Sequence, residues 1–325
     1  MIIVTGGAGF IGSALVWALN KKGREDIIIV DHFGKDDKYK NLVSLKFMDV
    51  FDRDDFGQMV HDGFLKNNKV DVLYHLGACS STTELDMNFL LRNNFEYTKF
   101  LCGHSVNNNI RFVYASSAAT YGEGKQGYED DESKLDTLRP LNPYGYSKQL
   151  FDQWAKREGY LDRIAGMKYF NVFGPNEYHK GDMQSIVSKA YKQVKEKGTA
   201  RLFKSYSKEY GNGEQKRDFV YVKDAVDMTI YFGENKIVNG IYNVGTGNAN
   251  TFNSFVKPIF KALGVKENIE YFEMPEVLQG RYQDFTQANM DKIRKTGYKG
   301  TFTSIEDAVI DYVKNYLDSD YQYLN

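Results

Sequence analysis

The chain has 325 residues, of which 42 are Lys or Arg and 43 are Asp or Glu, and this balance argues against nucleic acid or an anionic membrane as a partner. Its two cysteines, Cys79 and Cys102, are too few for a disulfide framework or a structural zinc site, so no metal is expected. The first residues resemble neither a signal peptide nor a membrane span of about 18 apolar residues, which predicts a cytoplasmic protein.

Short apolar runs in the first half of the chain alternate with longer amphipathic segments. We predict strands at Ile2–Val4, Ile27–Val30, Val43–Phe47, Val70–His75, Phe112–Ser116 and Ala165–Phe170. The spacing of apolar residues predicts helices over residues 11–22, 91–106 and 146–157. Strands that alternate with helices form a parallel sheet with helices on both faces. The predicted fold is therefore α/β, a Rossmann-like doubly wound parallel sheet.

The alternation ends after Asn171, where a smaller, discontinuous substrate-binding domain is expected to begin. Gly174-Pro175 and the polar stretch 205–215 are typical of loops, and they flank a helix predicted over 183–197. A strand over 240–244 then returns to the large sheet, and a last helix covers 304–316. We expect a Rossmann domain of residues 1–170 plus about 218–248, and a substrate-binding domain of about 171–217 and 249–325.

A glycine-rich turn, Thr5-Gly6-Gly7-Ala8-Gly9-Phe10-Ile11-Gly12, follows the first strand. Glycines at this spacing let the backbone approach a pyrophosphate, which the N–H groups and dipole of the following helix can bind, although such turns also occur without a ligand. Asp31 follows Gly12 by 19 positions, at the end of the second strand, where a carboxylate can accept hydrogen bonds from a ribose. Leu76–Ser80 ends the fourth strand at the same edge. Together these features predict a bound dinucleotide.

The residues after the second strand leave the choice between NAD and NADP open. The Asp31 carboxylate favours NAD, because it repels the additional phosphate of NADP. Lys35, Lys38 and Lys40 follow in the next loop, and Arg53 lies further along, so cations could offset that repulsion. The same charges would also suit a solvated loop and the start of a helix.

A Tyr144-x-x-x-Lys148 pair begins the third predicted helix. Residues four apart share a helix face, so both side chains can point at a nicotinamide, and we expect the ammonium of Lys148 to lower the pKa of the Tyr144 phenol. Alone, this spacing would more often be an ordinary helix contact. Ser117 precedes Tyr144 by 27 positions, at the end of the fifth strand, where its hydroxyl could bind the oxygen being oxidised. The choice between Ser116 and Ser117 depends on the phase of the strand.

Further short motifs point to a family. They are Gly77-Ala78-Cys79-Ser80-Ser81-Thr82-Thr83-Glu84, Tyr114-Ala115-Ser116-Ser117-Ala118-Ala119-Thr120-Tyr121-Gly122, His179-Lys180-Gly181 and Gly280-Arg281-Tyr282-Gln283. With the glycine turn and the Tyr-Lys pair, they make nearly the whole chain resemble the extended short-chain dehydrogenases/reductases, the family of sugar-nucleotide epimerases and dehydratases. Within that family, the four motifs are similar to those of enzymes that epimerise ADP-heptose at C6.

The resemblance implies a reaction, a cofactor and partners. It implies that a bound NADP, or NAD, oxidises C6 of an ADP-heptose to a ketone and returns hydride to the opposite face. Tyr144 and Lys180 match the family's two acid/base groups, and Lys148 would orient the cofactor and tune Tyr144. From the residues alone, Lys180 would be a flexible surface cation. The resemblance also implies a homo-oligomer, a pentamer by analogy, that supplies heptose for the lipopolysaccharide core.

The resemblance also carries over binding residues position by position. For the cofactor it implies Gly6, Gly9, Phe10, Ile11, Gly12, Asp31, His32, Lys38, Arg53, Leu76, Gly77, Ala78, Cys79, Ser80, Asn93, Lys148, Val172 and Lys180. For the nucleotide sugar it implies Ser117, Asn171, Asp182, Lys189, Phe203, Lys204, Ser205, Tyr206, Arg217, Arg281 and Tyr282. Arg217 and Arg281 are the expected phosphate ligands. Their spacing also suits ion pairs with Asp218 and Asp284.

A few positions depart from the family pattern. Asp182 stands where we expect a serine, and Lys189 where we expect a histidine, and the loop 205–215 is longer. These departures bear on how the heptose is recognised. His32 and Leu76 also differ from the pattern, at the cofactor site.

Three other functions compete with this interpretation. A sugar-nucleotide 4,6-dehydratase needs an Asp-Glu pair just after Ser117, where this chain has Ala118-Ala119. A UDP-hexose 4-epimerase would fit Tyr144, Lys148 and Ser117 equally well, but Lys180 and the Gly-Ala-Cys motif argue against it. A non-catalytic cofactor-binding regulator would need none of these side chains.

Overall fold

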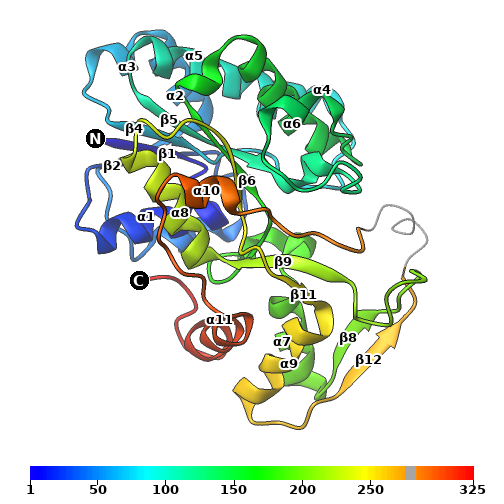
Figure 1. The fold of residues 1–325 in the computed structure, drawn as a ribbon. Helices are drawn as coiled ribbons and strands as arrows, with labels where there is room; N and C mark the ends of the chain where they lie inside the picture. Colours follow the sequence, from blue (N-terminus) through cyan, green and yellow to red (C-terminus); the bar gives the residue numbers. More distant parts are fainter. Residues whose placement is uncertain (275–282) are drawn as a thin grey trace.

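The computed structural model describes residues 1–274 and 283–325, and a seven-stranded sheet forms its centre (Figure 1). The strand order is β10-β6-β5-β4-β1-β2-β3, and every pairing is parallel. The strands are β1 (Ile2–Thr5), β2 (Ile27–Asp31), β3 (Asp49–Asp52), β4 (Val72–His75), β5 (Arg111–Ser117), β6 (Ala165–Tyr169) and β10 (Gly240–Val244). The order reverses between β1 and β4, which is where such sheets bind dinucleotides. The predicted Rossmann-like α/β fold is confirmed.

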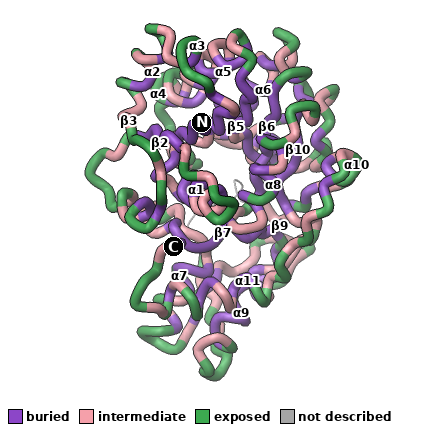
Figure 2. The backbone as a smooth tube through the Cα atoms, turned by 90° about the vertical axis from the view of Figure 1, so that its left-hand side faces the viewer, coloured by how far each residue is buried: buried purple, intermediate pink, exposed green. Residues whose placement is uncertain are grey.

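Helices cover both faces of this sheet, so its strands are apolar on both sides and mostly buried (Figure 2). Ile2 and Val4 of β1 pack with the face of α1 and α8, whereas Ile3 packs with α2, α5 and α6. These helices are α1 (Phe10–Lys21), α2 (Arg53–His61), α5 (Tyr97–Asn107), α6 (Pro143–Arg157) and α8 (Val222–Glu234). Shorter ones are α3 (Phe64–Asn67), α4 (Met87–Leu90), α10 (Asp291–Lys295), η1 (Asp37–Leu42), η3 (Ala118–Tyr121), η4 (Glu132–Thr137) and η5 (Tyr160–Asp162).

The third predicted strand, Val43–Phe47, is wrong. The strand that pairs with β2 is β3, and the ladder begins where Met48 N donates to Ile27 O at 2.8 Å. β3 is an edge strand with exposed polar ends, so it lacks the apolar run that marks a central strand. Leu45 instead packs with the core beside α1 from an irregular loop.

The predicted helix over 91–106 forms, but it is not α-helical throughout. Leu91–Glu96 is a π-helical stretch, η2, between α4 and α5. The wider turn presents Asn93 and Asn94 toward the sheet edge, and insertions of this kind are often found at functional sites. Apolar spacing does not distinguish a π-helical turn from an α-helical one.

The second half adds two small sheets beyond the edge of the large one. β11 (Ala249–Thr251), β9 (Lys216–Tyr221) and β7 (Asn171–Phe173) form one, and β12 (Ile269–Phe272) and β8 (Ala200–Phe203) form the other. They pack with α7 (Ile186–Lys197) and α9 (Phe252–Leu263), beside α11 (Ile305–Tyr312), η6 (Tyr178–Met183) and η8 (Val313–Leu317). The predicted domain boundaries stay a prediction.

Residues 321–325, the tail segment, close over η6 and α1. Leu324 is 1% exposed, and its N–H donates to Asn176 Oδ1 at 3.0 Å. Tyr178 hydroxyl donates to Gln322 O at 2.7 Å, and Trp17 Nε1 donates to Asn325 O at 3.0 Å. The tail segment therefore links the start of η6 to α1.

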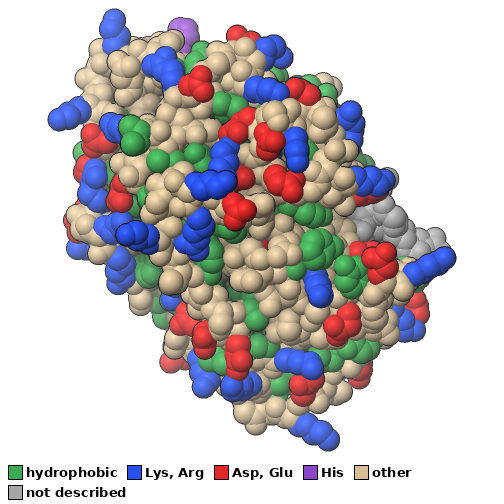
Figure 3. Space-filling model, viewed as in Figure 1, with side chains coloured by type: hydrophobic (Ala, Val, Ile, Leu, Met, Phe, Trp, Pro, Cys, Tyr) green, Lys and Arg blue, Asp and Glu red, His purple; other side chains and the backbone are tan. Residues whose placement is uncertain are grey.

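On the face in Figure 3, Lys and Arg side chains are interspersed with Asp and Glu. Charges of the two signs are thus mixed on this face rather than separated into patches. Within residues 1–274 and 283–325, no helix combines the length and apolar character needed to cross a membrane.

Candidate active site

A first cavity, the cofactor cavity, opens at the carboxyl ends of β1, β2 and β4. Half of the predicted cofactor residues line it: Gly6, Asp31, His32, Lys38, Arg53, Gly77, Ala78, Cys79 and Asn93. The wall also contains Thr5, Phe89 and Tyr97, which the sequence interpretation did not include. Parallel strands that end at one edge bring these distant segments together.

Close backbone packing explains the glycines of the turn. Gly6 has a φ of +67°, and a Cβ there would lie 2.6 Å from Gly77 Cα. A Cβ on Gly12 would lie 2.0 Å from Gly6 O. Gly9 caps the start of α1 and has no side chain to cover the amides of the first helical turn. The turn can therefore present backbone N–H groups to a phosphate, as a dinucleotide requires.

Asp31 is the buried acid of this cavity, at 8% exposed. It accepts hydrogen bonds from Ala8 N and His32 N, each at 2.8 Å, and Lys38 Nζ lies 2.8 Å from Oδ1. Lys38 thus forms an ion pair with Asp31 rather than extending into a solvated loop. Arg53 donates to Asn93 Oδ1, and its guanidinium lies 5.8 Å from the centre of the Tyr97 ring.

Asn94 joins the cofactor cavity to α6, although the sequence interpretation missed it. Cys79 N donates to Asn94 Oδ1, and Asn94 Nδ2 donates to Cys79 O, both at 2.9 Å. The same amide reaches Ser147 Oγ on α6 at 3.0 Å. This pairing fixes the backbone of the Gly-Ala-Cys segment. An Asn beside other Asn and Arg residues in a polar run gives little signal by itself.

A second cavity, the reaction cavity, adjoins the ends of β5 and β6. Eight predicted residues line it: Phe10, Ile11, Ser80, Ser117, Tyr144, Asn171, Val172 and Lys180. They come from α1, the turn after β4, β5, α6, β7 and η6. The wall also includes Met183, Gln184 and Phe219, which the sequence interpretation had not assigned to a site.

Tyr144 lies in the first turn of α6, which begins at Pro143 behind the cap Asn142. A hydrogen bond links its hydroxyl to Ser117, while Ser116 points the other way and donates to Asp152. The strand phase therefore selects Ser117. Burial raises the pKa of Tyr144, with the Ser117 hydrogen bond acting in the opposite direction.

Lys148 is 5% exposed, and its Nζ donates to Ala115 O at 2.7 Å. Burial lowers the pKa of Lys148 to about 8, against the influence of Asp152 and Cys79. The expected lowering of the Tyr144 pKa by Lys148 is not found in this structure, because burial dominates and Lys148 is not among the causes. Burial thus opposes formation of the tyrosinate in this structure.

Lys180 is not a flexible surface cation. It is partly buried in η6, and its Nζ lies 5.1 Å from the centre of the Phe10 ring. Burial lowers the pKa of Lys180, which Glu177 opposes and Lys189 reinforces. Glu177 itself is buried and accepts hydrogen bonds from Ser185 N and Oγ at 2.6 Å. The Lys180 amine therefore lines the reaction cavity with a pKa below its ordinary value.

A third cavity, the outer cavity, lies between α7 and the small sheets. Lys189 and Phe203 line it, and Phe252 borders both it and the reaction cavity. Arg217 is buried on β9 with its guanidinium 5.6 Å from the centre of the Phe252 ring. The alternative ion pair with Asp218 is not seen: that carboxylate accepts N–H groups from Thr246, Gly247 and Ala288 at 2.8 to 3.0 Å.

The other predicted substrate residues lie further out. Lys204 and Tyr206 both contact Glu273, and Ser205 N donates to Asn212 Oδ1 at 2.9 Å. Asp182 is exposed, and its carbonyl accepts a hydrogen bond from Lys189. Leu76, a predicted cofactor residue, does not line the cofactor cavity, and its N–H donates to Thr5 O at 3.1 Å. Arg281 and Tyr282 lie outside the described residues.

Comparison with known proteins decides the family. The model of the NAD dependent epimerase/dehydratase family matches residues 2–245. The chain belongs to this family. A relative from Nitratidesulfovibrio vulgaris, named ADP-L-glycero-D-manno-heptose-6-epimerase, is 53% identical over 317 residues, covering 98% of each chain. One of the same name from Fusobacterium nucleatum is 48% identical over 335 residues, covering 100% of each.

A solved structure extends the family likeness to the whole chain. The Helicobacter pylori ADP-L-glycero-D-manno-heptose-6-epimerase superposes with a TM-score of 0.81 at 27% identity, covering 97% of this chain and 95% of that one. The epimerase/dehydratase family uses a nicotinamide dinucleotide, and the cofactor cavity of this chain fits one. The cavity combines a buried carboxylate, two cations and a glycine turn with open amides.

Proposed function

We propose that this chain converts ADP-D-glycero-D-manno-heptose to ADP-L-glycero-D-manno-heptose, a precursor of the lipopolysaccharide core, by inverting C6. The observation that carries the proposal is the reaction cavity, where Tyr144 and Lys180 come from two different elements and Ser117 lies beside Tyr144. A hydride that leaves one face of a carbon and returns to the other needs acid/base groups that can serve both half-reactions. The names of the relatives supply the substrate.

We propose NADP as the cofactor, with NAD as the alternative. The support is the Lys38–Asp31 ion pair, which offsets the charge that would repel an additional phosphate, and Arg53 in the same wall. When bound, the nicotinamide would accept a hydride from C6 and later return it to C6. The identity of the cofactor is testable by mass spectrometry of the molecule that copurifies with the protein.

The protons are handled by the chain's own residues. Burial lowers the pKa of Lys180, which favours the neutral amine as the base that takes the O6 proton while C6 loses hydride. Burial raises the pKa of Tyr144, which favours the phenol as the acid that returns a proton to O6 when hydride comes back to the other face. A proton then passes from the Lys180 ammonium through solvent to the Tyr144 phenolate, which restores both groups for the next turnover. Ser117 binds O6, and Lys148 holds α6 to Ala115.

In this proposal, the small sheets and α7 bind the nucleotide part of the substrate. Lys189 and Phe203 would border the nucleotide in the outer cavity, and Arg217 would bind a phosphate from beside Phe252. Residues 171–217 and 249–325 would thus form the substrate-binding part. We further propose that the protein works in the cytoplasm as a homo-oligomer, a pentamer by family resemblance.

The first test follows the hydrogen on C6. Purified protein is incubated with ADP-D-glycero-D-manno-heptose that carries deuterium at C6, and the product is analysed by NMR and mass spectrometry. We expect the L-glycero epimer with the label retained, because the hydride returns from where it was stored. Loss of label to water would contradict the redox route. In a parallel assay, epimerisation of UDP-galactose but not of the ADP-heptose would show that the substrate is a UDP-hexose.

The second test asks whether the side chains of Tyr144 and Lys180 themselves are needed for turnover. Tyr144→Phe and Lys180→Met should each lower kcat by about 100-fold or more, since a positioned acid or base contributes about 10²–10⁴-fold. Cofactor binding by Tyr144→Phe should stay within about threefold. Tyr146→Phe, two residues further along the same helix and exposed, is the matched control and should keep full activity. Unchanged turnover in Tyr144→Phe would remove the proposed chemistry.

A further inference from the structure

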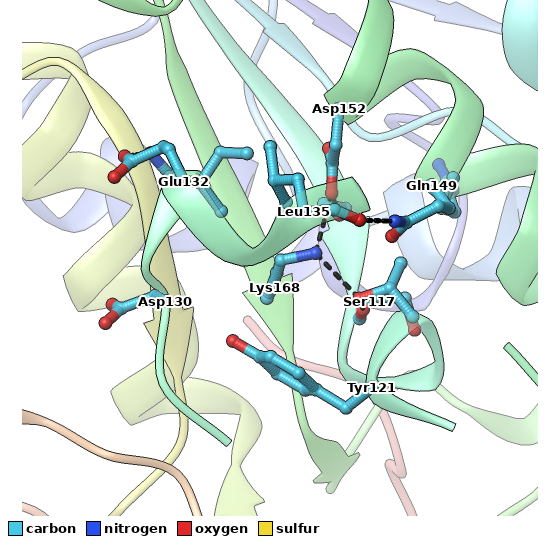
Figure 4. A network of polar contacts seen from close by, with 12 residues as sticks. Ser117, Tyr121, Asp130, Glu132, Leu135, Gln149, Asp152 and Lys168 are labelled. Carbon is cyan, nitrogen blue, oxygen red and sulfur yellow. Dashed lines mark hydrogen bonds and ion pairs between the residues drawn. The ribbon is translucent and has the colours of Figure 1, made fainter. Parts of the chain in front are cut away.

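A buried ion pair, Asp152–Lys168, lies beside the turn that carries Ser117. Asp152 stands on α6 and Lys168 on β6, and the two side chains are 0% and 1% exposed. Lys168 Nζ lies 2.6 Å from Asp152 Oδ2. Figure 4 shows the lysine between the carboxylate and the turn that carries Ser117. No step of the proposed reaction uses either group.

The pair binds the chain on both sides of Ser117. Before it, Ser116 Oγ donates to Asp152 Oδ2 at 2.7 Å. After it, Lys168 Nζ donates to Thr120 Oγ1 at 2.6 Å, and Thr120 Oγ1 donates to the carbonyl of Ser117 at 2.8 Å. The backbone of Ser117 is therefore held from two directions by groups that end on the same pair.

The pair also ties this turn to the helix that carries Tyr144. Asp152 lies one turn after Lys148 on α6, and its Oδ1 accepts from Tyr114 hydroxyl at 2.9 Å. Lys148 Nζ binds the carbonyl of Ala115 at 2.7 Å. Three successive residues of β5, 114 to 116, are thus bonded to α6, and the next residue is Ser117. This fixes the position of the strand end relative to the helix.

Stability alone is a poor reason for such a pair. Removing two charges from water costs free energy that their attraction barely repays, and well-packed apolar residues in their place are often as stable. A buried pair with several directed hydrogen bonds does, however, specify one geometry. We propose that Asp152 and Lys168 are positioning residues that hold the Ser117 hydroxyl against Tyr144. This role in catalysis rests on the function proposed above.

The test uses two variants and one control. Lys168→Met removes the cation, and Thr120→Val leaves the ion pair intact but removes its link to the Ser117 carbonyl. Arg111→Met is the control: Arg111 is a buried cation at the start of β5, the strand that ends at Ser117, and it is 3% exposed. Among the described residues its guanidinium donates to Phe232 O, Val238 O and Asn239 Oδ1. Each protein is assayed for kcat, KM, cofactor affinity and unfolding by urea.

We expect kcat to fall about tenfold or more in both Lys168→Met and Thr120→Val, since small misplacements at a reacting centre are costly. KM and cofactor affinity should change less than about threefold. Arg111→Met should lose stability and keep kcat within about twofold. Wild-type kcat in Thr120→Val, or an equal loss of kcat in the control, overturns the proposal.

A crystal structure of Thr120→Val tests the inference without any substrate. We expect the Ser117 carbonyl and hydroxyl to move relative to Tyr144, and an unmoved Ser117 overturns the positioning role. Failure of the proposed function gives a different result: wild-type protein would then turn over no ADP-heptose, while the displacement of Ser117 in the variant would still be measured.

Discussion

His75 connects the end of β1 to η2 and α5 beside the cofactor cavity through a chain of directed hydrogen bonds. The Thr98 hydroxyl donates its one proton to Asn94 O at 2.6 Å, so it must accept from His75 Nε2 at 2.9 Å. His75 Nδ1 then accepts from Thr5 Oγ1 at 2.7 Å. The ring is therefore the neutral tautomer with its proton on Nε2. Burial lowers the pKa of His75 to about 3.

That burial makes folding stability depend on pH. Below its ordinary pKa of about 6.5, His75 takes up a proton only in the unfolded chain, so stability falls with pH until the folded-state pKa of about 3 is reached. Between about pH 7 and about pH 5 we expect a loss on the order of 2 kcal/mol from this residue. Urea unfolding at both pH values should show this difference.

His75→Gln provides the comparison, because it keeps a donor and an acceptor but does not titrate in this range. The pH dependence of its unfolding should be weaker than that of the wild type by the same amount. Taking the difference between the two proteins removes contributions from other groups, such as Asp130, whose pKa burial raises to about 6. Equal slopes in the two proteins would show that His75 is not the source.

Single residues also show what the sequence can and cannot predict. Tyr144, Lys148 and Lys180 were predicted by motif, and the fold brings Tyr144 and Lys180 to one cavity. The sequence could not choose between Ser116 and Ser117, since that depends on strand phase. It could not identify Asn94 either, because an asparagine that bonds backbone at the sheet edge has no local pattern.

At the scale of elements, apolar patterns predicted the buried central strands well but did not predict the strand at the edge of the sheet. β1, β2 and β5 are buried on both faces and were predicted to within a residue or two. β3 was missed, because an edge strand has no need of an apolar run. The π-helical turn of η2 could not be predicted for a related reason: its apolar residues keep nearly the helical period.

The contact between α1 and the glycine turn gives an element-scale prediction. Gly12→Ala would place a methyl group 2.0 Å from Gly6 O, so α1 must shift away from the turn. We expect cofactor affinity to fall more than about tenfold, since pyrophosphate binding depends on close backbone approach. Isothermal titration with NADP measures it.

Gly103→Ala on α5 is the matched control for that substitution. A Cβ there meets nothing within 4 Å, so the change should leave affinity unaltered and stabilise the helix by up to about 1 kcal/mol. If both variants bind cofactor as the wild type does, the contact between helix and turn is not what the glycine provides.

At the scale of the whole molecule, the tail segment links the two halves of the active site. It packs on α1, which starts at the cofactor turn, and bonds to Asn176 and Tyr178, just before Lys180. Asn176 Nδ2 in turn donates to Ser13 Oγ on α1 at 2.9 Å. No local pattern in residues 321–325 predicts this role, because its partners lie far away in the sequence.

Leu324→Ala should therefore affect more than stability. Truncating a buried leucine costs about 2–5 kcal/mol of unfolding free energy, and here we also expect kcat to fall several-fold as η6 loosens around Lys180. Leu161→Ala, at a similarly buried leucine in η5, should lose comparable stability with kcat intact. Unfolding by urea and steady-state kinetics provide both readouts. A similar effect on kcat in the two variants would argue against a special role for the tail segment.

The tail segment also gives the molecule an optical reporter. Of its two tryptophans, Trp17 donates to the tail backbone, while Trp154 lies on α6 and packs against Phe151 and Tyr160. Release of the tail would expose the Trp17 indole to water and leave Trp154 unchanged. In a Trp154→Phe background, the emission spectrum therefore follows detachment of the tail alone, and in a Trp17→Phe background it follows the loss of packing around α6. Different midpoints in the two backgrounds would show that the segment detaches before the molecule unfolds.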